Sequence, residues 1–385
     1  MRYDVAIVGA GPAGSWLARE LAKNNISVAL FERSAVAGEP NFSSAGSPLY
    51  TAERFNLPPE AIAAKWDAIR IVGPNSGQEW QFKKPVGAVF DFRKLKSMLT
   101  DEARSYGAKV ILGTAVESAE QKGSYAFIHT KPQQDEYLAK IVVDASGPGG
   151  VLATQIGLRR KILSLPSTGL EIIVNAKLAL DKEFSTMTFY YGSTWVPHGY
   201  GWIFPMQTPF LKIGAGVAQP ARYHPVINLD NILNNLIERI PWAKNSEIVE
   251  KHGGSVWGTG GIKNHVQGNI IAIGDAADQI NPLGGEGIRH VLQSSLLASR
   301  VIIDALKENN IKALYRYNNL WKSYVGWKWR VCHKIADIVY PNFSDRRWDQ
   351  LTKLLAKLSA EEVFDILFEY KAGPVVRALF RKQIF

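Results

Sequence analysis

The pattern of apolar and polar positions near the start of the chain predicts a strand, a helix and a second strand. Residues 4–8 form a short run rich in β-branched side chains, and residues 15–24 place apolar side chains on one helical face. Residues 26–31 predict the second strand, which Glu32 follows. A βαβ unit is therefore expected, with the glycine-rich residues 9–14 forming its first turn.

The middle of the chain predicts a mostly antiparallel sheet, and its end predicts helices. Further strands are expected at residues 108–113, 141–143, 170–180, 186–191, 201–205, 211–217 and 269–273. Helices are expected at residues 90–106, 232–240 and 285–306, and almost throughout from residue 311. Ser359 and Glu362 form a capping-box pattern that opens a helix extending to Tyr370. Because no repeat or low-complexity linker separates these regions, we expect interleaved domains.

The first glycine-rich turn has the spacing of a dinucleotide-binding motif. It reads Gly9-Ala-Gly11-Pro12-Ala13-Gly14. Gly9 permits the tight turn, Gly11 lets a pyrophosphate approach the backbone, and Gly14 lets the helix lie close to the sheet. Glu32, at the end of the second strand, can accept hydrogen bonds from ribose hydroxyls. The strand, helix and acid together predict dinucleotide binding rather than a surface turn.

A second glycine-rich segment favours FAD over NAD. Gly274 and Asp275 follow the predicted strand at residues 269–273, and residues 281–287 are rich in glycine before a long helix. A carboxylate at a strand end can accept hydrogen bonds from a sugar-alcohol chain, and a helix start can offer N–H groups to an electron-rich ring edge. FAD has a ribityl chain whose hydroxyl groups need hydrogen-bond partners, and NAD has no such chain.

Composition and cysteine usage exclude several classes of protein. The 385 residues are 46% apolar and 21% charged, as in a globular chain with a large core. The single cysteine, Cys332, excludes an internal disulfide, a dithiol pair, a zinc–thiolate site and a protein-ligated iron–sulfur cluster. No metal site is predicted. Residues 184–211 form the longest stretch without a charge, but Pro197, Pro205 and Pro209 argue against a membrane-spanning helix. With no signal-peptide pattern, we expect a cytoplasmic protein, soluble or peripheral on a membrane.

The net charge of +10 is concentrated near the end of the chain. Residues 307–385 contain 15 Lys/Arg and 8 Asp/Glu, together with Trp321, Trp327, Trp329 and Trp348. This mixture suits an anionic membrane surface or an acidic electron carrier. A basic, solvated helical face explains it equally well. Nucleic acid is disfavoured as a partner.

Several motifs resemble those of FAD-dependent oxidoreductases with the aromatic-hydroxylase fold. They are the opening glycines, residues 143–147 with Asp144 and Gly147, and the Gly274-Asp275 segment with Pro282 and residues 285–287. Within that superfamily the chain resembles the geranylgeranyl reductase family. The segments that carry this resemblance are residues 199–205 (Gly-Tyr-Gly-Trp-Ile-Phe-Pro), 213–216 and 281–288, together with residues 347–348 and 358–362 near the C-terminus.

The resemblance implies an α/β fold in three parts. An FAD-binding Rossmann-like domain would comprise residues 1–165 and 255–310. An antiparallel-sheet substrate domain would comprise residues 166–254 with parts of 40–92, and a helical C-terminal region would comprise residues 311–385. The resemblance also implies cofactor-binding roles for Gly9, Gly11, Pro12, Ala13, Gly14, Glu32, Arg33, Arg93, Ala115, Asp144, Gly147, Gly274, Asp275, Pro282, Gly285, Glu286, Gly287 and Ile288.

The activity that the resemblance implies is reduction of C=C bonds in an isoprenoid or other apolar substrate. Trp202 and Phe204 would help to wall the substrate site, and the candidate proton donors are His198, Tyr200 and His290. No second strand–GxGxxG–helix unit is present, so no dedicated NAD(P)H domain is expected. The reductant would therefore be NADPH that docks transiently or a reduced electron-carrier protein. Where the family often carries a Lys-Pro-Cys-Gly type of segment, this chain has Ser43 and Ser44 and no cysteine, so a mechanism that needs that thiol is excluded.

Three alternative functions share the same cofactor. The first alternative is a monooxygenase that acts on a hydrophobic ring. The second is a flavin-bound assembly or partner-binding protein with little turnover, and the third is a lycopene cyclase. No acidic motif argues for the cyclase. Halogenation is disfavoured because residues 200–205 do not match the Trp-x-Trp-x-x-Ile-Pro segment of halogenases with this fold.

Overall fold

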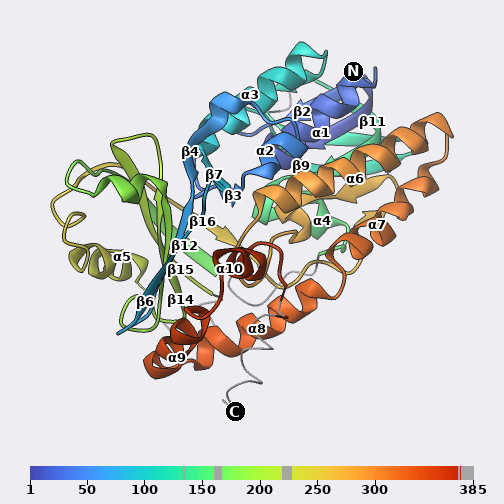
Figure 1. Ribbon diagram of the computed structural model, residues 1–385. Coiled ribbons are helices and arrows are strands. Elements are labelled where there is room, and N and C mark those ends of the chain that lie inside the picture. The colour runs from blue at the N-terminus through green and yellow to red at the C-terminus, as the bar shows by residue number, and fades with distance from the viewer. Residues whose placement is uncertain (133–134, 160–166, 219–227, 372, 374–385) are drawn as a thin grey trace. The chain divides into compact units, whose positions relative to one another are not determined.

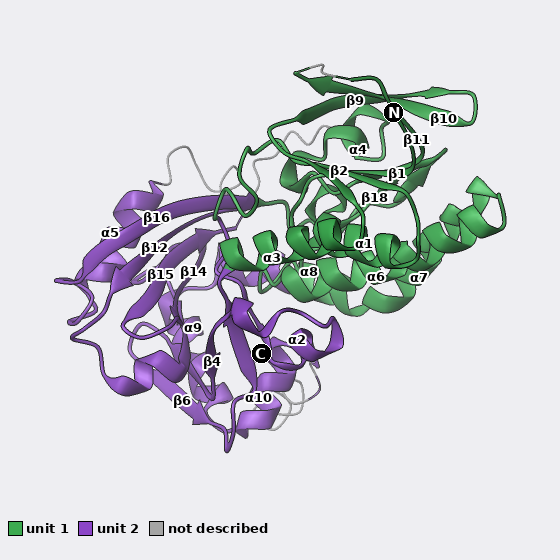
Figure 2. Ribbon diagram, turned by 90° about the horizontal axis from the view of Figure 1, so that it is seen from above, with its two compact units in different colours: residues 1–41, 92–163, 256–333 green, residues 42–91, 164–255, 334–385 purple. Residues whose placement is uncertain are grey.

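The computed structural model describes residues 1–132, 135–159, 167–218, 228–371 and 373, and Figure 1 labels its helices and strands where there is room. The chain forms two compact units (Figure 2). Unit 1 comprises residues 1–41, 92–163 and 256–333, and unit 2 comprises residues 42–91, 164–255 and 334–385. The predicted helical C-terminal region is thus divided at residue 333, within helix α8 (Lys328–Asn342).

Unit 1 is built on a largely parallel sheet. Its strand order is β17 (Val266–Gln267), β18 (Ile270–Ala272), β11 (Tyr137–Asp144), β1 (Arg2–Val8), β2 (Val28–Phe31) and β8 (Lys109–Ile111), with the hairpin β9 (Ala115–Lys122) and β10 (Tyr125–Lys131) attached to β11. The strands from β18 to β8 are parallel to one another. Its helices are α1 (Pro12–Lys23), α3 (Phe92–Ser105), α4 (Val151–Gln155), α6 (Ile288–Lys307) and α7 (Arg316–Val325).

The core of unit 1 joins segments that are far apart in the chain. Ile7 on β1, Leu17 on α1 and Ile271 on β18 are fully buried in one apolar cluster, and Ala298 on α6 belongs to the same cluster. Two hydroxyl contacts fix α1 further. Ser15 Oγ lies 2.9 Å from Thr100 Oγ1 on α3, and Ser295 Oγ on α6 donates to Ala13 O at 2.9 Å. The helix α1 is therefore held between its two helical neighbours.

Unit 2 contains an extended sheet that is mostly antiparallel. Its strand order is β16 (Glu247–Val256), β12 (Ser167–Asn175), β15 (Phe210–Val217), β14 (Gly199–Pro205), β13 (Thr186–Tyr191), β5 (Ala68–Val72) and β6 (Gly77–Gln81). A smaller sheet has the order β3 (Gly46–Pro48), β7 (Gly87–Phe90) and β4 (Ile62–Trp66). The helices of unit 2 are α2 (Tyr50–Arg54), α5 (Leu229–Glu238), α9 (Asp345–Leu355) and α10 (Ala360–Leu367).

The two faces of the extended sheet differ in chemistry because neighbouring side chains on a strand point to opposite faces. Ile172, Ile203 and Ile213 pack on one face with Leu236 of α5. The opposite face carries Phe189, Tyr200, Trp202 and Phe204, which pack in a cluster with Val363 of α10. This second face is called the aromatic face below.

The fold class predicted from the sequence is confirmed, and the predicted strand at residues 186–191 coincides with β13. The capping box at Ser359 and Glu362 is present. The long helix begins at Ile288 rather than residue 285, because Gly285 has a left-handed φ of +67°. The strand predicted to extend to residue 180 ends at Asn175, where the Ala176 N–H bonds to the carbonyl of Pro209. The hairpin β9–β10 and the edge strand β16 were not predicted.

No helix within the described ranges is long and apolar enough to cross a bilayer. The argument from prolines is consistent with the structure, since residues 186–191 and 199–205 form strands.

Gly87 allows the first test of this packing. A Cβ at Gly87 would lie 1.8 Å from the buried ring of Trp66, whereas a Cβ at Gly77 would have no atom nearer than 3.7 Å. We expect Gly87→Ala to lower the free energy of unfolding by about 1–3 kcal/mol through overpacking. Gly77→Ala, the control, should change it by less than about 0.5 kcal/mol. Chemical denaturation measures both, and equal values for the two variants would contradict the packing described.

Candidate functional site

The turn between β1 and α1 requires glycine at two positions. Gly9 has a left-handed φ of +102°, and a Cβ there would lie 2.4 Å from Ala145 O. A Cβ at Gly14 would lie 1.9 Å from Gly9 O. Side chains at these two positions would therefore separate α1 from the ends of β1 and β11.

Gly11 and the start of α1 have space around them. A Cβ placed on Gly11 would meet no atom within 4 Å. The helix begins at Pro12, and no side chain caps its first N–H groups. These groups and the positive end of the helix dipole favour an anion such as a pyrophosphate. Gly11, Pro12 and Ala13 lie at this helix start, and their role in cofactor binding stays a prediction.

Glu32 holds this turn in place. Its Oε2 accepts from Ala10 N and its Oε1 accepts from Ser34 N, both at 2.9 Å. Each carboxylate oxygen keeps a further lone pair, which can accept from a ribose hydroxyl. Arg33 is exposed beside it, and Ala115 begins β9 after Thr114, whose N–H bonds to the carbonyl of Glu32.

The second glycine turn lies against the first. Gly274 has a φ of +63°, and a Cβ there would lie 3.1 Å from the Cβ of Ala13. Its N–H donates to Gln279 Oε1 at 2.6 Å and to Ser294 Oγ at 3.3 Å. Two motifs that are distant in the sequence are therefore in contact within unit 1.

In the part of the chain that the structure describes, the Asp275 carboxylate accepts no hydrogen bond, although the Asp275 carbonyl accepts one from Asp278 N. Burial and the neighbouring Asp278 carboxylate raise the pKa of Asp275 to about 6, against the opposing effect of Arg159. Asp278 differs, because it accepts from the N–H groups of Gly258, Thr259 and Gly261 at 2.8–3.1 Å. A partly buried carboxylate without a donor is suited to accept hydrogen bonds from a bound ligand.

Asp144 shapes the loop that follows β11. It is fully buried; its Oδ1 accepts from Ser146 N at 3.0 Å and its Oδ2 from Ala153 N at 2.7 Å. Gly147, within this loop, has a φ of +74°, and a Cβ there would meet no atom within 4 Å. Asp144 thus holds the loop, while Gly147 leaves room beside it.

The segment before α6, residues 281–287, is held by hydrogen bonds to Asn281. Asn281 Oδ1 accepts from Leu283 N and Gly284 N, both at 2.9 Å, and the Gly285 N–H bonds to the Asn281 carbonyl. These bonds form the turn that contains Pro282. Gly287 precedes Ile288, the first helical residue, and no side chain caps the helix.

Glu286 and His290 lie together in unit 1. Although burial would raise the pKa of Glu286, Arg289 and His290 lower it to about 2. Arg289 donates to both carboxylate oxygens, at 3.0 and 2.8 Å. His290 Nδ1 lies 3.0 Å from Tyr324 Oη, and its ring contacts Trp329. His290 is therefore enclosed by protein groups.

Arg93 forms an ion pair with Glu39 at 2.6 Å, with its side chain 45% exposed. The structure places it at the start of α3 in unit 1.

Sequence reasoning missed Arg159, which is buried beside three carboxylates. Its Nη1 donates to Pro148 O at 2.7 Å, and its guanidinium lies 4.6 Å from the centre of the Trp257 ring. Burial lowers the pKa of Arg159, while Asp278, Asp144 and Asp275 oppose this effect. Its Nη2 has no hydrogen-bond partner among the described residues. No local pattern marks this arginine, because the fold alone brings it to these acids.

Trp202 and Tyr200 lie together in unit 2. Both are on β14, and their ring centroids are 5.6 Å apart. Phe189 lies 6.1 Å from Tyr200 and 5.5 Å from Phe204, so the rings form a continuous surface. Because burial raises the pKa of Tyr200 to about 12, its hydroxyl keeps its proton at neutral pH.

The features of unit 1 fit FAD. The open space at Gly11 and Gly147 suits phosphates, and the carboxylate of Asp275 lacks a donor as a ribityl-binding residue would. Together with the parallel sheet, they define an FAD-dependent oxidoreductase. Residues 4–157 match the model of the FAD dependent oxidoreductase family, and residues 170–256 match the geranylgeranyl reductase catalytic domain.

Comparison with known proteins identifies the family. The chain is 30% identical to digeranylgeranylglycerophospholipid reductase 3 of Methanosphaera stadtmanae, over 95% of each chain. It is also 30% identical to the digeranylgeranylglycerophospholipid reductase of Methanocaldococcus jannaschii, over 92% of this chain and 91% of that one. The chain belongs to the geranylgeranyl reductase family, as the sequence motifs indicated.

A solved structure shares the fold. The geranylgeranyl bacteriochlorophyll reductase-like protein of Thermoplasma acidophilum superposes with a TM-score of 0.88 at 23% identity, covering 99% of this chain and 96% of that one.

Asp275 and Asp278 should respond to substitution in opposite ways. A folded-state pKa near 6 means that the folded protein binds more protons than the unfolded chain between about pH 4 and 6, so stability without FAD falls as pH rises through that range. Asp275→Asn should remove this fall and stabilise the FAD-free protein at pH 7 by about 1–2 kcal/mol. It should also weaken FAD binding by about 10- to 100-fold.

Asp278→Asn provides the control for this pair. Asparagine keeps one accepting oxygen but places an NH₂ group where the other carboxylate oxygen accepts from residues 258–261, so the FAD-free protein should lose about 1–3 kcal/mol. Denaturation at several pH values and titration with FAD measure both effects. An Asp275→Asn protein that binds FAD as tightly as the parent would exclude Asp275 from the cofactor site.

Proposed function

We propose that this protein reduces C=C bonds in the polyprenyl chains of a lipid. The aromatic face of unit 2 is the observation that carries the proposal. It lies within the residues that match the geranylgeranyl reductase catalytic domain. The printed names of the two archaeal relatives, digeranylgeranylglycerophospholipid reductases, support a polyprenyl lipid as the substrate class.

The aromatic face suits an extended apolar chain. Phe189, Tyr191 and Tyr200 are partly buried, and the Tyr191 ring stacks on Trp348 at 4.8 Å. Rings of this kind offer a large rigid contact area, and only the Tyr hydroxyls and the Trp N–H require hydrogen-bond partners. A hydrocarbon chain, saturated or unsaturated, binds through apolar contact area from which water is excluded.

Bound FAD supplies the hydride equivalent for this chemistry. The groups proposed to hold it are those of the two glycine turns, with Glu32, Asp275 and Gly147. Tyr200 is the proposed proton donor, since it retains its proton at neutral pH, and Trp202 is proposed to contact the substrate. We assign His290 a positioning role, because its contacts fix the Glu286 segment.

The electron donor is proposed to be NADPH or a reduced carrier protein. Gly258–Gly261, the other glycine-rich stretch, is bound by the Asp278 carboxylate instead of opening a helix. This arrangement offers no second dinucleotide turn there, which supports a donor that docks transiently.

Contact with an anionic membrane is proposed at the corner between α7 and α8. Three tryptophans of this region are buried and pack in the protein interior, namely Trp321, Trp329 and Trp348. Trp327, in contrast, is 57% exposed. Residues 309–336 contain six Lys/Arg and no Asp/Glu. An exposed tryptophan in a cationic segment favours an anionic bilayer surface. The basic residues at 377–382 lie outside the described residues.

An anaerobic flavin assay tests the proposed reaction. We expect NADPH or a chemical reductant to bleach the flavin spectrum, and a polyprenyl lipid extract to restore it without oxygen. Mass spectrometry should then detect a gain of two hydrogen atoms per reduced double bond. Reoxidation that requires oxygen and gives an oxygenated product would overturn the proposal in favour of a monooxygenase. A flavin that no lipid reoxidises would favour a partner-binding role.

Vesicle sedimentation tests the membrane surface. Binding to anionic vesicles should weaken as salt rises, and Trp327→Ala should weaken it by about 10-fold through loss of an interfacial ring. Tyr106→Ala, which removes a ring that is 49% exposed on another segment of unit 1, is the control. Equal binding to neutral and anionic vesicles would contradict the electrostatic contribution.

A further inference from the structure

We propose that Glu171, Lys212 and His252 form a buried positioning network that orients Trp202 and the segment 43–46 for substrate binding. The inference rests on the proposed function, in which Trp202 contacts the polyprenyl chain. It concerns residues of unit 2 alone.

Strand register places Glu171 beside Trp202. Glu171 on β12 pairs with Gly214 on β15, and Gly214 pairs with Trp202 on β14. The three positions therefore form one row on the aromatic face. The middle position has no side chain, and a Cβ on Gly214 would lie 2.2 Å from the Trp202 ring. The indole thus lies across β15 toward β12.

Neighbouring glycines extend the surface under the ring. A Cβ on Gly216 would lie 3.3 Å from the indole, and a Cβ on Gly169 would lie 3.4 Å from it. The indole N–H donates to Glu171 Oε2 at 2.6 Å. Close backbone contact fixes the plane of the ring, and the hydrogen bond fixes its rotation within that plane.

Glu171 also binds two basic side chains. His252 Nε2, on the edge strand β16, lies 2.9 Å from Glu171 Oε1, and Lys212 Nζ lies 3.7 Å from the same oxygen. The side chains of Glu171 and Lys212 are only 4% and 1% exposed. Although burial opposes it, Lys212, His252 and Ser44 lower the pKa of Glu171, so the carboxylate stays charged.

Lys212 connects this carboxylate to the segment 43–46. Its Nζ donates to Ser43 O and Ser44 O, both at 3.0 Å. Ala45, the next residue, has a left-handed φ of +57°. A Cβ on Gly46 would lie 2.4 Å from Met187 and 3.1 Å from Phe204, so this segment packs against the aromatic face.

Stability alone does not explain such a network. Burying two charges costs several kcal/mol, and apolar residues of similar volume are often as stabilising as a buried ion pair. The network does fix geometry, since the Glu171 carboxylate holds the orientation of the Trp202 ring. Lys212, beside that carboxylate, holds the backbone of the segment 43–46. A carboxylate on the indole N–H also makes the ring face more attractive to positive charge. Adding a proton and a hydride across a double bond develops such charge on the substrate carbon.

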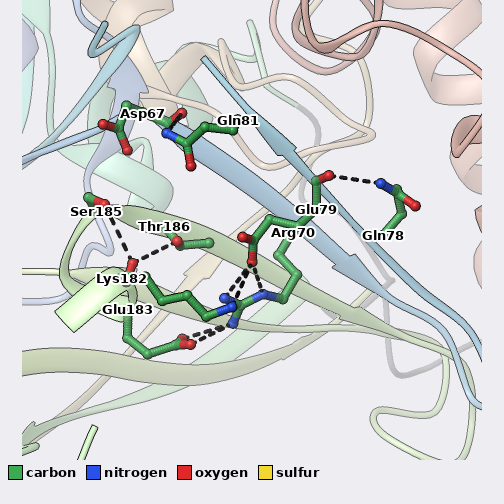
Figure 3. A network of polar contacts seen from close by, with 9 residues as sticks. All are labelled: Asp67, Arg70, Gln78, Glu79, Gln81, Lys182, Glu183, Ser185 and Thr186. Carbon is green, nitrogen blue, oxygen red and sulfur yellow. Dashed lines mark hydrogen bonds and ion pairs between the residues drawn. The ribbon is translucent and has the colours of Figure 1, made fainter. Parts of the chain in front are cut away.

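A second buried carboxylate of unit 2, that of Glu183, pairs with the partly buried Arg70 and provides a control. Arg70 on β5 donates to both carboxylate oxygens of Glu183, at 2.8 and 2.9 Å, and also binds Glu79 (Figure 3). Arg70 pairs with Thr188, whereas Phe189, the next residue along β13, pairs with Trp202. The Arg70 network therefore lies on the opposite face of the sheet from Trp202.

The test compares Glu171→Gln with Glu183→Gln in the full-length, FAD-loaded protein. Both changes remove the charge of a buried carboxylate that pairs with a basic side chain. We expect Glu171→Gln to lower kcat/KM with a polyprenyl lipid by about 100-fold, a size typical of misplaced binding groups. Glu183→Gln should stay within about 2-fold of the parent. Glu171→Gln/Lys212→Met, which restores charge balance, should fold as the parent does and remain impaired.

A spectroscopic measurement makes the inference independent of turnover. The indole N–H proton of Trp202, assigned with Trp202→Phe, should resonate far downfield in the parent and move upfield in Glu171→Gln but not in Glu183→Gln. If the parent reduces no polyprenyl lipid, the proposed function fails while this signal still tests the hydrogen bond. If the parent is active and Glu171→Gln matches Glu183→Gln in kcat/KM, the positioning network is overturned. An unmoved Trp202 signal in Glu171→Gln overturns it as well.

Discussion

The close approach of backbone segments around Gly9 is the constraint on which unit 1 depends. The helix α1 can lie over the end of β1 only because Gly14 has no side chain to meet Gly9 O, and β11 can follow beside it only because Gly9 has none to meet Ala145 O. Gly274 then brings a third segment against α1 at Ala13. The space for a pyrophosphate is thus a product of backbone packing, at the carboxyl ends of parallel strands where such sheets bind ligands.

Unit 2 uses the same device for a different purpose. Its glycines at 169, 214 and 216 leave space on two neighbouring rows of the aromatic face, and the Trp202 indole occupies that space. Both units therefore place their functional groups where side chains are missing. They differ in how charge is handled, because among the described residues the Asp275 carboxylate has no hydrogen-bond donor whereas the Glu171 carboxylate has several.

The local motifs and the long periodic elements could be predicted from the sequence. The glycines of the first turn, the capping box at Ser359 and the long helix at Ile288 each depend on residues close together in the chain. Arg159 and the edge strand β16 could not be predicted, because their partners come from distant segments.

The sequence contains a pattern that indicates the Glu171 network, although the sequence analysis did not interpret it. Glu171 lies between Leu170 and Ile172, and Lys212 lies between Leu211 and Ile213. A charged residue that interrupts an apolar strand is costly unless a partner balances it. Two such residues of opposite sign predict a buried pair, but only the strand register shows that they meet beside Trp202.

The interleaving of the two units has a consequence for synthesis of the chain. Unit 1 lacks β18 and α6 until residues 256–333 have been made, and unit 2 lacks α9 and α10 until residues beyond 334 follow. Unit 1 therefore cannot complete its core until two of the three segments of unit 2 have been translated, and unit 2 is completed last. During elongation the end of β11 at residues 142–144 waits without its partner β18, and an unpaired strand edge of this kind makes a nascent chain prone to aggregate.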